Sequence, residues 1–328
     1  MTEEIGTDRG GQRIAVIGAG AIGSVMGGFL ARHGGHEVHL LGRGWHLDPV
    51  AARGLHVTGI WGDCRIHGLR LHTSPESLLS AGPFDYVMVC VKAVDTVSVR
   101  QCAAEASGSE GYVVSLQNGL GNAEALAEVV PEERLLVGRV IFGVEIQPAE
   151  VEVTVSADDT VIGGWPSGCR SEAAERFAKL LVAARIPARA TEHVDRFLWA
   201  KLIYNCALNP LASLMDCPYG ALLKTAETRE WMKRIVYECY AVAEACGVRL
   251  EPLTAQDYIT LLFETLIPVT AEHHPSMLQA LRMGKRTEIS ALNGEVVRRG
   301  RQHGVSVSAL DALRTLIQAK EALVRPGR

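Results

Sequence analysis

Three polar side chains recur at every fourth position of an otherwise apolar segment, Phe197 to Leu211. They are Lys201, Asn205 and Asn209, and this spacing places them on one stripe of a helix. A buried lysine without a partner is costly, so we expect the stripe to line a cleft. The alternative is a bundle helix that uses these groups as structural hydrogen bonds.

A glycine-rich turn near the N-terminus carries a second chemistry. The motif is Gly18-Ala19-Gly20-Ala21-Ile22-Gly23, which follows an apolar run at 13–17 and opens a helical pattern. In a dinucleotide fingerprint the first glycine permits a tight turn, the second lets a pyrophosphate approach the backbone, and the third allows close packing of helix on strand. The helix N-terminus attracts the phosphates. We therefore predict a dinucleotide site, with a ligand-free turn as the alternative.

The end of the next predicted strand, residues 37–41, indicates which dinucleotide is bound. An enzyme that uses NAD usually places an acidic residue there to bind the ribose hydroxyl. This chain has Arg43 and no acidic residue at that point. Arg43 could hold a 2′-phosphate, so we predict a preference for NADPH. An ordinary surface arginine is the alternative.

Two polar residues follow predicted parallel strands directly. Lys92 follows the strand expected at 86–91, and Asn118 follows the one expected at 112–116. Ligands of open α/β sheets bind outside the carboxyl ends of the strands, so the equivalent placement favours a shared cleft. Turn chemistry for Asn118 and a solvated charge for Lys92 are the alternatives.

A lysine beside a nicotinamide would have a clear role. Hydride delivery to a ketone builds negative charge on oxygen, and an ammonium group can stabilise that charge and donate a proton. The chain has only 7 lysines beside 26 arginines, and an arginine could not readily release a proton. Lys201 is therefore the candidate acid.

Residues 275–294 form a further polar cluster. Ser276 with Gln279 fits a helix capping box, and a contact between Ser276 and the substrate is the other interpretation. Glu288 lies among apolar positions, so its side chain could point toward Lys201. A solvated glutamate is the alternative.

The elements that must position these residues predict an α/β fold, in which an N-terminal Rossmann-type doubly wound sheet precedes an all-helical C-terminal domain. We divide the chain into a loose tail (1–12), an NADP-binding domain (13–190) and a helical substrate domain (191–328). Further strand-like pieces lie at 135–144, 151–155 and 160–163, and we expect them to add an antiparallel edge to the sheet. Long helical periods lie at 195–215, 220–246, 254–266, 277–299 and 308–324.

Composition excludes several classes of protein. The 328 residues are 48% hydrophobic, which argues against disorder, and the net charge of −4 predicts no binding to nucleic acid. We find no window long and apolar enough to span a membrane and no signal-peptide pattern. The eight cysteines form no C-x-x-C pair and suit reduced thiols in the cytoplasm. The histidines lack metal-ligand spacing, so we expect no metal.

Taken together, the motifs resemble the ketopantoate reductase (2-dehydropantoate 2-reductase) family over residues 13–322. The order and spacing carry the resemblance, from the glycine motif through Val91-Lys92-Ala93 and Gln117-Asn118-Gly119-Leu120-Gly121 to the Lys201 stripe with Pro210, Ser276-Met277-Leu278, and Glu288 with Asn293-Gly294.

The resemblance implies reduction of a 2-oxo acid by NADPH, giving pantoate for pantothenate and coenzyme A biosynthesis. Lys201 would be the general acid, and Glu288 would bind substrate or support the acid. Asn118, Asn205, Asn209 and Ser276 would contact the substrate. The cofactor would bind at Gly18, Ala19, Gly20, Ala21, Ile22, Gly23, Arg43, Lys92 and Asn118. A homodimer is a candidate assembly that the sequence does not decide.

Three residues depart from the family pattern and put the acyl side chain of the substrate in doubt. Tyr219 follows Cys217-Pro218 where some members carry asparagine, and Phe142 and Glu145 fall near the expected rim of the cleft. A bulkier 2-oxo acid is therefore one alternative substrate. A β-hydroxyacid dehydrogenase is a second enzymatic alternative, and a non-catalytic NADPH-binding sensor is the alternative from another class.

Overall fold

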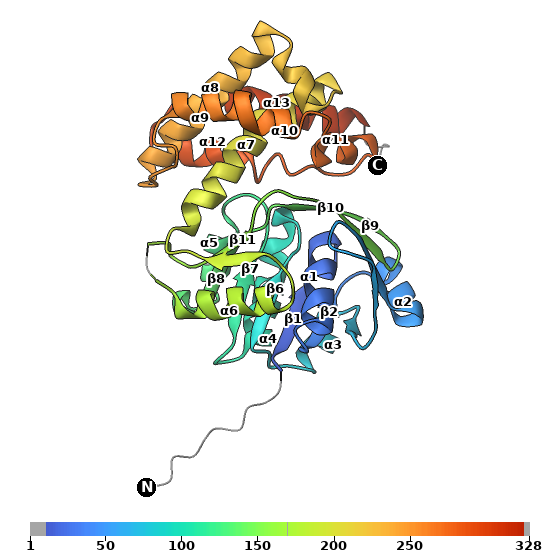
Figure 1. Ribbon diagram of the computed structural model, residues 1–328. Coiled ribbons are helices and arrows are strands. Elements are labelled where there is room, and N and C mark those ends of the chain that lie inside the picture. The colour runs from blue at the N-terminus through green and yellow to red at the C-terminus, as the bar shows by residue number, and fades with distance from the viewer. Residues whose placement is uncertain (1–10, 169, 325–328) are drawn as a thin grey trace. The chain divides into compact units, whose positions relative to one another are not determined.

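The computed structural model describes residues 11–168 and 170–324 (Figure 1), so most of the expected tail lies outside the described residues. The chain forms two compact units. The first comprises the described part of Met1–Gln117 together with Asn122–Val194, and the second comprises Asn118–Gly121 with the described part of Asp195–Arg328. The short Asn118 segment thus groups with the helical unit, which the sequence did not indicate.

The first unit contains a sheet of eight strands in the order β12-β11-β8-β7-β6-β1-β2-β5. Neighbouring strands are parallel except that β11 runs antiparallel to β8, in line with the antiparallel edge inferred from the sequence. The strands are β1 Arg13–Ile17, β2 Glu37–Leu41, β5 Arg70–His72, β6 Tyr86–Val89, β7 Tyr112–Ser115, β8 Leu135–Arg139, β11 Thr160–Gly164 and β12 Ala188–Ala190.

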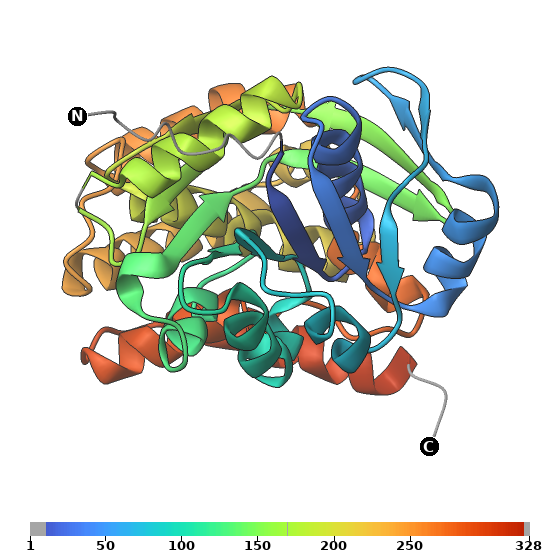
Figure 2. The same ribbon diagram turned by 90° about the horizontal axis from the view of Figure 1, so that it is seen from below.

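Helices cover both faces of this sheet (Figure 2). One face carries α1 (Ala21–Arg32) and α6 (Glu172–Ala183), and the other carries α3 (Pro75–Leu79), α4 (Thr96–Ser107) and α5 (Asn122–Ala127). The doubly wound prediction is therefore confirmed. Three short helices complete the unit: α2 (Gly44–Arg53), η1 (Ala93–Asp95) and η2 (Glu132–Arg134).

A second sheet in the same unit was not predicted. It has the order β4-β3-β10-β9 and consists of β3 Leu55–Gly59, β4 Cys64–Ile66, β9 Phe142–Gln147 and β10 Glu150–Ser156. Helix α1 packs between the two sheets, because a Cβ on Gly27 would meet Leu40 at 2.7 Å and one on Gly28 would meet Ile66 at 2.9 Å. The glycine pair lets the helix lie close to both layers.

This sheet also changes the role expected for Phe142. Its ring is buried in the core of the first unit, 4.6 Å from the ring of Trp61. The expectation that Phe142 lies at a cleft rim is therefore wrong, because pairing of β9 with β10 turns its side chain inward. Glu145, three residues along β9, is exposed.

The second unit is helical, as predicted. Its core gathers apolar side chains of α7 with those of α8, α12 and α13. The elements are α7 Val194–Met215, η3 Tyr219–Leu223, α8 Ala226–Ala245, α9 Ala255–Leu261, the π-helical turn η4 Leu262–Leu266, α10 Ile267–Val269, α11 Ser276–Arg282, α12 Asn293–Gln302 and α13 Ser308–Val324.

One expected helix is wrong. The pattern at 277–299 indicated a continuous helix, but α11 ends at Arg282 and α12 begins at Asn293. Gly284, with φ of +62°, donates from its N–H to the carbonyl of Leu281 and ends α11 in a left-handed conformation. Buried apolar residues in the following turns imitate helical spacing.

Candidate active site

Lys201, Asn118 and Glu288 form a chain of hydrogen bonds within the second unit. Lys201 Nζ donates to Asn118 Oδ1 at 2.7 Å, and Asn118 Nδ2 donates to Glu288 Oε2 at 3.4 Å. All three residues are half-buried. The amide of Asn118 thus presents its oxygen to a cation and its N–H to a carboxylate, which is the complementary arrangement. From the sequence we expected Glu288 to point toward Lys201. In the structure the amide of Asn118 bonds to both side chains and links them.

A close backbone approach brings Asn118 to this position. Gly119 has φ of +82°, and a Cβ on it would lie 2.5 Å from the carbonyl oxygen of Ala291. Only glycine therefore lets the Asn118 turn pack against the segment that carries Glu288. Leu120, the next residue, packs against the helical core.

Glu288 lies in the irregular segment that separates α11 from α12. Its carbonyl oxygen accepts from the N–H groups of Ala291 and Leu292, which closes a turn. The N–H of Thr287 donates to Glu321 Oε1 on α13 at 2.6 Å. The carboxylate is thus held by a turn, whereas the sequence pattern placed it on a helix.

The polar stripe of α7 is present, with different burial along its length. Lys201 and Asn205 are half-buried, and Asn209 is 6% exposed. Asn209 Oδ1 accepts a hydrogen bond of 2.5 Å from the hydroxyl of Tyr219. Tyr219, singled out in the sequence as a departure from the family pattern, is therefore a direct neighbour of the stripe.

Pro210 interrupts the hydrogen bonds of α7 and reveals a residue that the sequence analysis did not assign. A proline has no N–H, so the carbonyl of Cys206, four residues earlier, lacks its usual helical donor. Asn293 Nδ2, at the start of α12, lies 3.5 Å from that carbonyl oxygen and donates to it. Asn293 is fully buried, so it ties α12 to the helix that carries Lys201. The sequence did contain a signal for this role of Asn293, because Pro210 leaves one carbonyl of the predicted helix without its backbone donor.

Ser276 is exposed and is the first residue of α11. Pro275 occupies the N-cap position, and no side chain caps the helix. The capping-box interpretation of Ser276 and Gln279 is therefore wrong, because the helix already begins at Ser276, one residue too early for Ser276 to act as the cap.

In the first unit the glycine motif forms the turn from β1 into α1. Gly18 has φ of +105°, and a Cβ there would meet the backbone nitrogen of Val91 at 2.7 Å. The turn thus packs against the end of β6, immediately before Lys92. The N–H groups of Gly18 and Ala19 donate to the carbonyl of Leu41, which fixes the turn to β2.

The three glycines of the motif have different surroundings. A Cβ on Gly23 would contact the carbonyl oxygen of Gly18, so Gly23 is required for packing. A Cβ on Gly20 would meet nothing within 4 Å. Gly20 is the N-cap of α1 and carries no side chain that could satisfy the first N–H groups of the helix. The first N–H groups of α1 can therefore donate to an anion, and Gly20 does not crowd it.

The two basic candidates of this unit are both exposed. Arg43 is the N-cap of α2 and follows β2 by two residues, and Lys92 is the N-cap of η1. Asn118, the remaining residue predicted to contact the cofactor, groups with the second unit.

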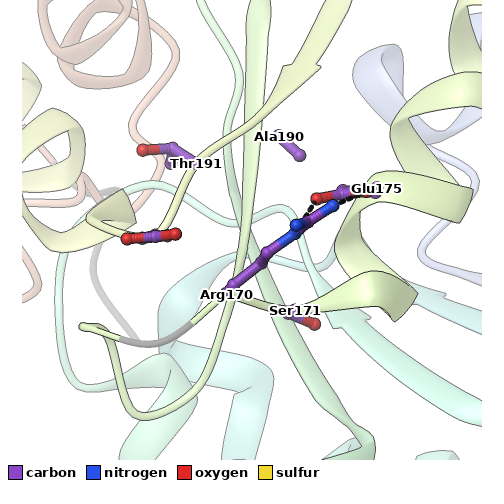
Figure 3. A pocket seen from close by; sticks show the side chains of 6 residues that line it. Arg170, Ser171, Glu175, Ala190 and Thr191 are labelled. Atoms are coloured by element: carbon purple, nitrogen blue, oxygen red, sulfur yellow. Dashed lines mark hydrogen bonds and ion pairs between the residues drawn. The ribbon is translucent and has the colours of Figure 1, made fainter.

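A hollow elsewhere in the first unit contains none of the predicted site residues (Figure 3). Its charged side chains include Arg170 and Glu175, and Arg170 Nε donates to Glu175 Oε1 at 2.7 Å. In residues 11–168 and 170–324 no group of three or more His, Cys, Asp or Glu could hold a metal ion. No helix of this described region is long and apolar enough to cross a membrane.

Comparison with known proteins identifies the family. Residues 14–167 match the model "Ketopantoate reductase PanE/ApbA", and residues 193–321 match "Ketopantoate reductase PanE/ApbA C terminal". A 2-dehydropantoate 2-reductase from Aquifex aeolicus is 37% identical over 312 residues, which cover 94% of this chain and 97% of that protein.

Solved structures agree. A PanE/ApbA family ketopantoate reductase from Ralstonia eutropha has a TM-score of 0.85 and 32% identity, and the match covers 95% of this chain and 99% of that one. A D-mandelate dehydrogenase, solved with NADH and anilino(oxo)acetate, has a TM-score of 0.84 over 95% of this chain and 99% of that one; at 24% identity it shows the fold alone. The chain belongs to the PanE/ApbA ketopantoate reductase family and is a nicotinamide-dependent oxidoreductase of the 2-dehydropantoate 2-reductase type.

Proposed function

We propose that this protein reduces a 2-oxo acid to a 2-hydroxy acid with NADPH, and that ketopantoate is its substrate. The observation that carries the proposal is the chain of hydrogen bonds from Lys201 through Asn118 to Glu288. It joins a proton donor to an amide and a carboxylate that orient it, which is what protonation of a developing alkoxide requires.

The bound cofactor would supply the hydride to the carbonyl carbon of the substrate. An ammonium group has three N–H donors, and the bond to Asn118 uses one of them. Lys201 would stabilise the negative charge on the carbonyl oxygen and transfer a proton to it. Glu288 would hold Asn118 in the orientation that presents Oδ1 to Lys201. Asn205, Asn209 and Ser276 would bind the substrate.

The cofactor would lie along the first unit. The turn from Gly18 to Gly23 would cradle the pyrophosphate, and Lys92, at the neighbouring strand end, would contact the same ligand. Arg43 would bind the 2′-phosphate of NADPH. Its place at the N-cap of α2 supports this role, because the first N–H groups of that helix add positive potential.

An acidic residue near Arg43 provides a control for a test of the preference for NADPH. Asp48 lies beside the start of α2, since a Cβ on Gly44 would meet its Oδ2 at 2.9 Å. We expect Arg43→Ala to weaken NADPH binding by about tenfold or more, as loss of a charged hydrogen bond of about 1.5–3 kcal/mol implies, and to leave NADH little changed. Asp48→Ala is the matched control and should not weaken NADPH. Tighter binding of NADH than NADPH to the unaltered chain would refute the preference.

A substrate panel tests the proposed reaction. The purified chain is mixed with NADPH and each of several 2-oxo acids, ketopantoate included, and cofactor oxidation is followed by absorbance. We expect ketopantoate to be reduced. Oxidation of 3-hydroxy acids without reduction of any 2-oxo acid would indicate a β-hydroxyacid dehydrogenase. Binding of NADPH with no oxidation by any acid would indicate a sensor.

The cytoplasmic location and the homodimer stay predictions from the sequence. Fractionation of the producing cells tests the first, and light scattering on the purified chain tests the second.

A further inference from the structure

Tyr219 is buried and contacts the polar stripe of α7, but the proposed reaction gives it no role. Its side chain is 3% exposed, and its hydroxyl donates to Asn209 Oδ1. The ring of Tyr204 meets it edge-on, with centroids 5.8 Å apart, and the ring of His273 lies 5.2 Å away. Three neighbours therefore fix the position of this ring.

The backbone of the same residue is also clamped. The N–H of Tyr219 donates to the carbonyl of His273 at 3.1 Å, and the N–H of Gly220 donates to Ala271 at 2.9 Å. A Cβ on Gly220 would lie 2.8 Å from that of Ala271, so the two segments are in close contact. Ser276, a proposed substrate contact, lies three residues after His273 in the same segment. Tyr219 is thus tied to α7 through Asn209 and to the segment before Ser276 through His273.

The hydroxyl of Tyr219 dictates how Asn209 is oriented. Burial raises the pKa of Tyr219 well above its ordinary value, so the hydroxyl keeps its proton. A buried O–H needs an acceptor, and Asn209 Oδ1 provides it. Asn209 Oδ1 therefore already has a donor inside the protein and is not left unpaired when a ligand offers it none.

We propose that Tyr219 is a specificity-determining residue: by donating to Asn209 Oδ1 it satisfies that acceptor, so the site accepts 2-oxo acids whether or not their side chain carries a hydroxyl group. This inference rests on the proposed reduction of 2-oxo acids and concerns which side chains of the substrate are accepted. A site that accepts a hydrogen bond from a substrate hydroxyl rejects analogues without it, because a buried acceptor is left unpaired. Here Tyr219 already satisfies that acceptor.

Two substrates that differ by one hydroxyl group test this directly. Trimethylpyruvate is ketopantoate with hydrogen in place of the hydroxyl, so the ratio of the two kcat/KM values isolates recognition of that group. In the unaltered chain we expect kcat/KM for ketopantoate to exceed that for trimethylpyruvate by less than about tenfold. Tyr219 already donates to Asn209 Oδ1, so this oxygen is not left unpaired when trimethylpyruvate binds. In Tyr219→Phe the freed Asn209 Oδ1 can accept from the hydroxyl, and the ratio should rise by about tenfold or more in favour of ketopantoate.

Tyr240→Phe is the matched control, because it also removes one tyrosine hydroxyl of the helical unit, bonded to the carbonyl of Pro252 at 2.9 Å. It should leave the ratio unchanged. Asn209→Asp is the second variant: it keeps an acceptor for Tyr219 but removes the amide donor, so kcat/KM should fall for both acids by a similar factor. Thermal unfolding checks that each variant is folded.

The outcomes separate the two proposals. A ratio that stays the same in Tyr219→Phe, or an unaltered chain that prefers ketopantoate by more than about a hundredfold, overturns the role of Tyr219 while the reductase activity stands. If neither acid is reduced by the unaltered chain, the proposed function fails, and the role of Tyr219 fails with it. Should Tyr219→Phe not fold, unequal loss of the two acids in Asn209→Asp overturns the inference, and equal loss supports it.

Discussion

The glycine turn of the first unit and the Lys201–Asn118–Glu288 chain of the second reach their geometry in different ways. The turn consists of backbone, and its shape follows from where a Cβ fits and where it does not. The chain consists of side chains, each oriented by a hydrogen bond to the next. A backbone site tolerates changes in the side chains around it, whereas a chain of side chains depends on every member.

The same contrast appears in how each unit handles buried polar groups. In the first unit His46 is fully buried, with Nε2 3.1 Å from Ser24 Oγ and Nδ1 3.1 Å from the carbonyl of Gln147. These bonds join α1, α2 and β9. In the second unit the buried polar groups Asn209 and Asn293 contact the helix that carries Lys201 or belong to it. His46 thus joins elements of the scaffold, whereas Asn209 and Asn293 contact or belong to the helix that carries Lys201.

The largest expected effect is the loss of Lys201. Lys201→Ala should lower kcat by about 100- to 10,000-fold, the contribution typical of a general acid, while NADPH still binds. Lys201→Arg should stay slow, because it keeps the charge but cannot release a proton. Steady-state kinetics and cofactor titration measure both quantities.

Lys224→Ala is the control for this pair, since it removes an exposed lysine of the same unit. Near-normal turnover in Lys201→Ala would remove the acid role and, with it, the idea that side chains carry the function of the second unit.

The next effect separates two glycines of one motif. Gly20→Ala should leave the melting temperature unchanged, because its Cβ meets nothing within 4 Å, but weaken NADPH binding by about tenfold or more by standing where the phosphates approach. Gly23→Ala should instead destabilise the fold by about 1–3 kcal/mol, since its Cβ contacts the Gly18 carbonyl. Calorimetric binding and thermal melts of both variants provide the comparison. Equal stability loss in the two variants would contradict it.

The difference between backbone and side-chain sites also explains what the sequence could predict. The glycine motif constrains local geometry, so it was recognisable, and the fourfold spacing placed Lys201, Asn205 and Asn209 on one helix. The break between α11 and α12 was missed because the buried Ile289 and Leu292 imitate a helical stripe. The second sheet was missed because β3 and β4 are short and β3 pairs with β10, which lies more than ninety residues away along the chain.

Side-chain pairing was the least predictable part. Nothing local indicates that Asn118 groups with the helical unit, since the reason is the approach of Gly119 to the distant Ala291. Likewise the Tyr219 bond to Asn209 depends on the fold of the segment that separates them. Such contacts follow from tertiary packing, to which spacing along the chain gives no access.

A smaller effect tests whether Asn293 compensates for Pro210. Asn293→Ala should lower the free energy of unfolding by about 1 kcal/mol, the net value of a hydrogen bond, and more if a cavity remains. In a Pro210→Ala background the new N–H can bond to the Cys206 carbonyl, so the same change should cost less. A double-mutant cycle by urea unfolding measures the coupling. An equal cost in both backgrounds would show that Asn293 has no link to the proline.

The smallest effect is a pH dependence of stability that belongs to the first unit. Burial lowers the pKa of His46 from 6.5, so the folded state keeps the ring neutral while the unfolded chain binds a proton more readily. The stability from this residue is therefore complete above pH 6.5 and is lost as the pH falls below it, with a slope of at most about 1.4 kcal/mol per pH unit. His46→Gln should flatten that part of the unfolding profile, whereas His67→Gln, at an exposed position, should not. The His46 side chain bonds to Ser24 Oγ and to the Gln147 carbonyl, neither of which has a proposed role in the reaction, so kcat of the folded variant at neutral pH should match that of the unaltered chain. A loss of kcat there would show that side chains also carry function in the first unit.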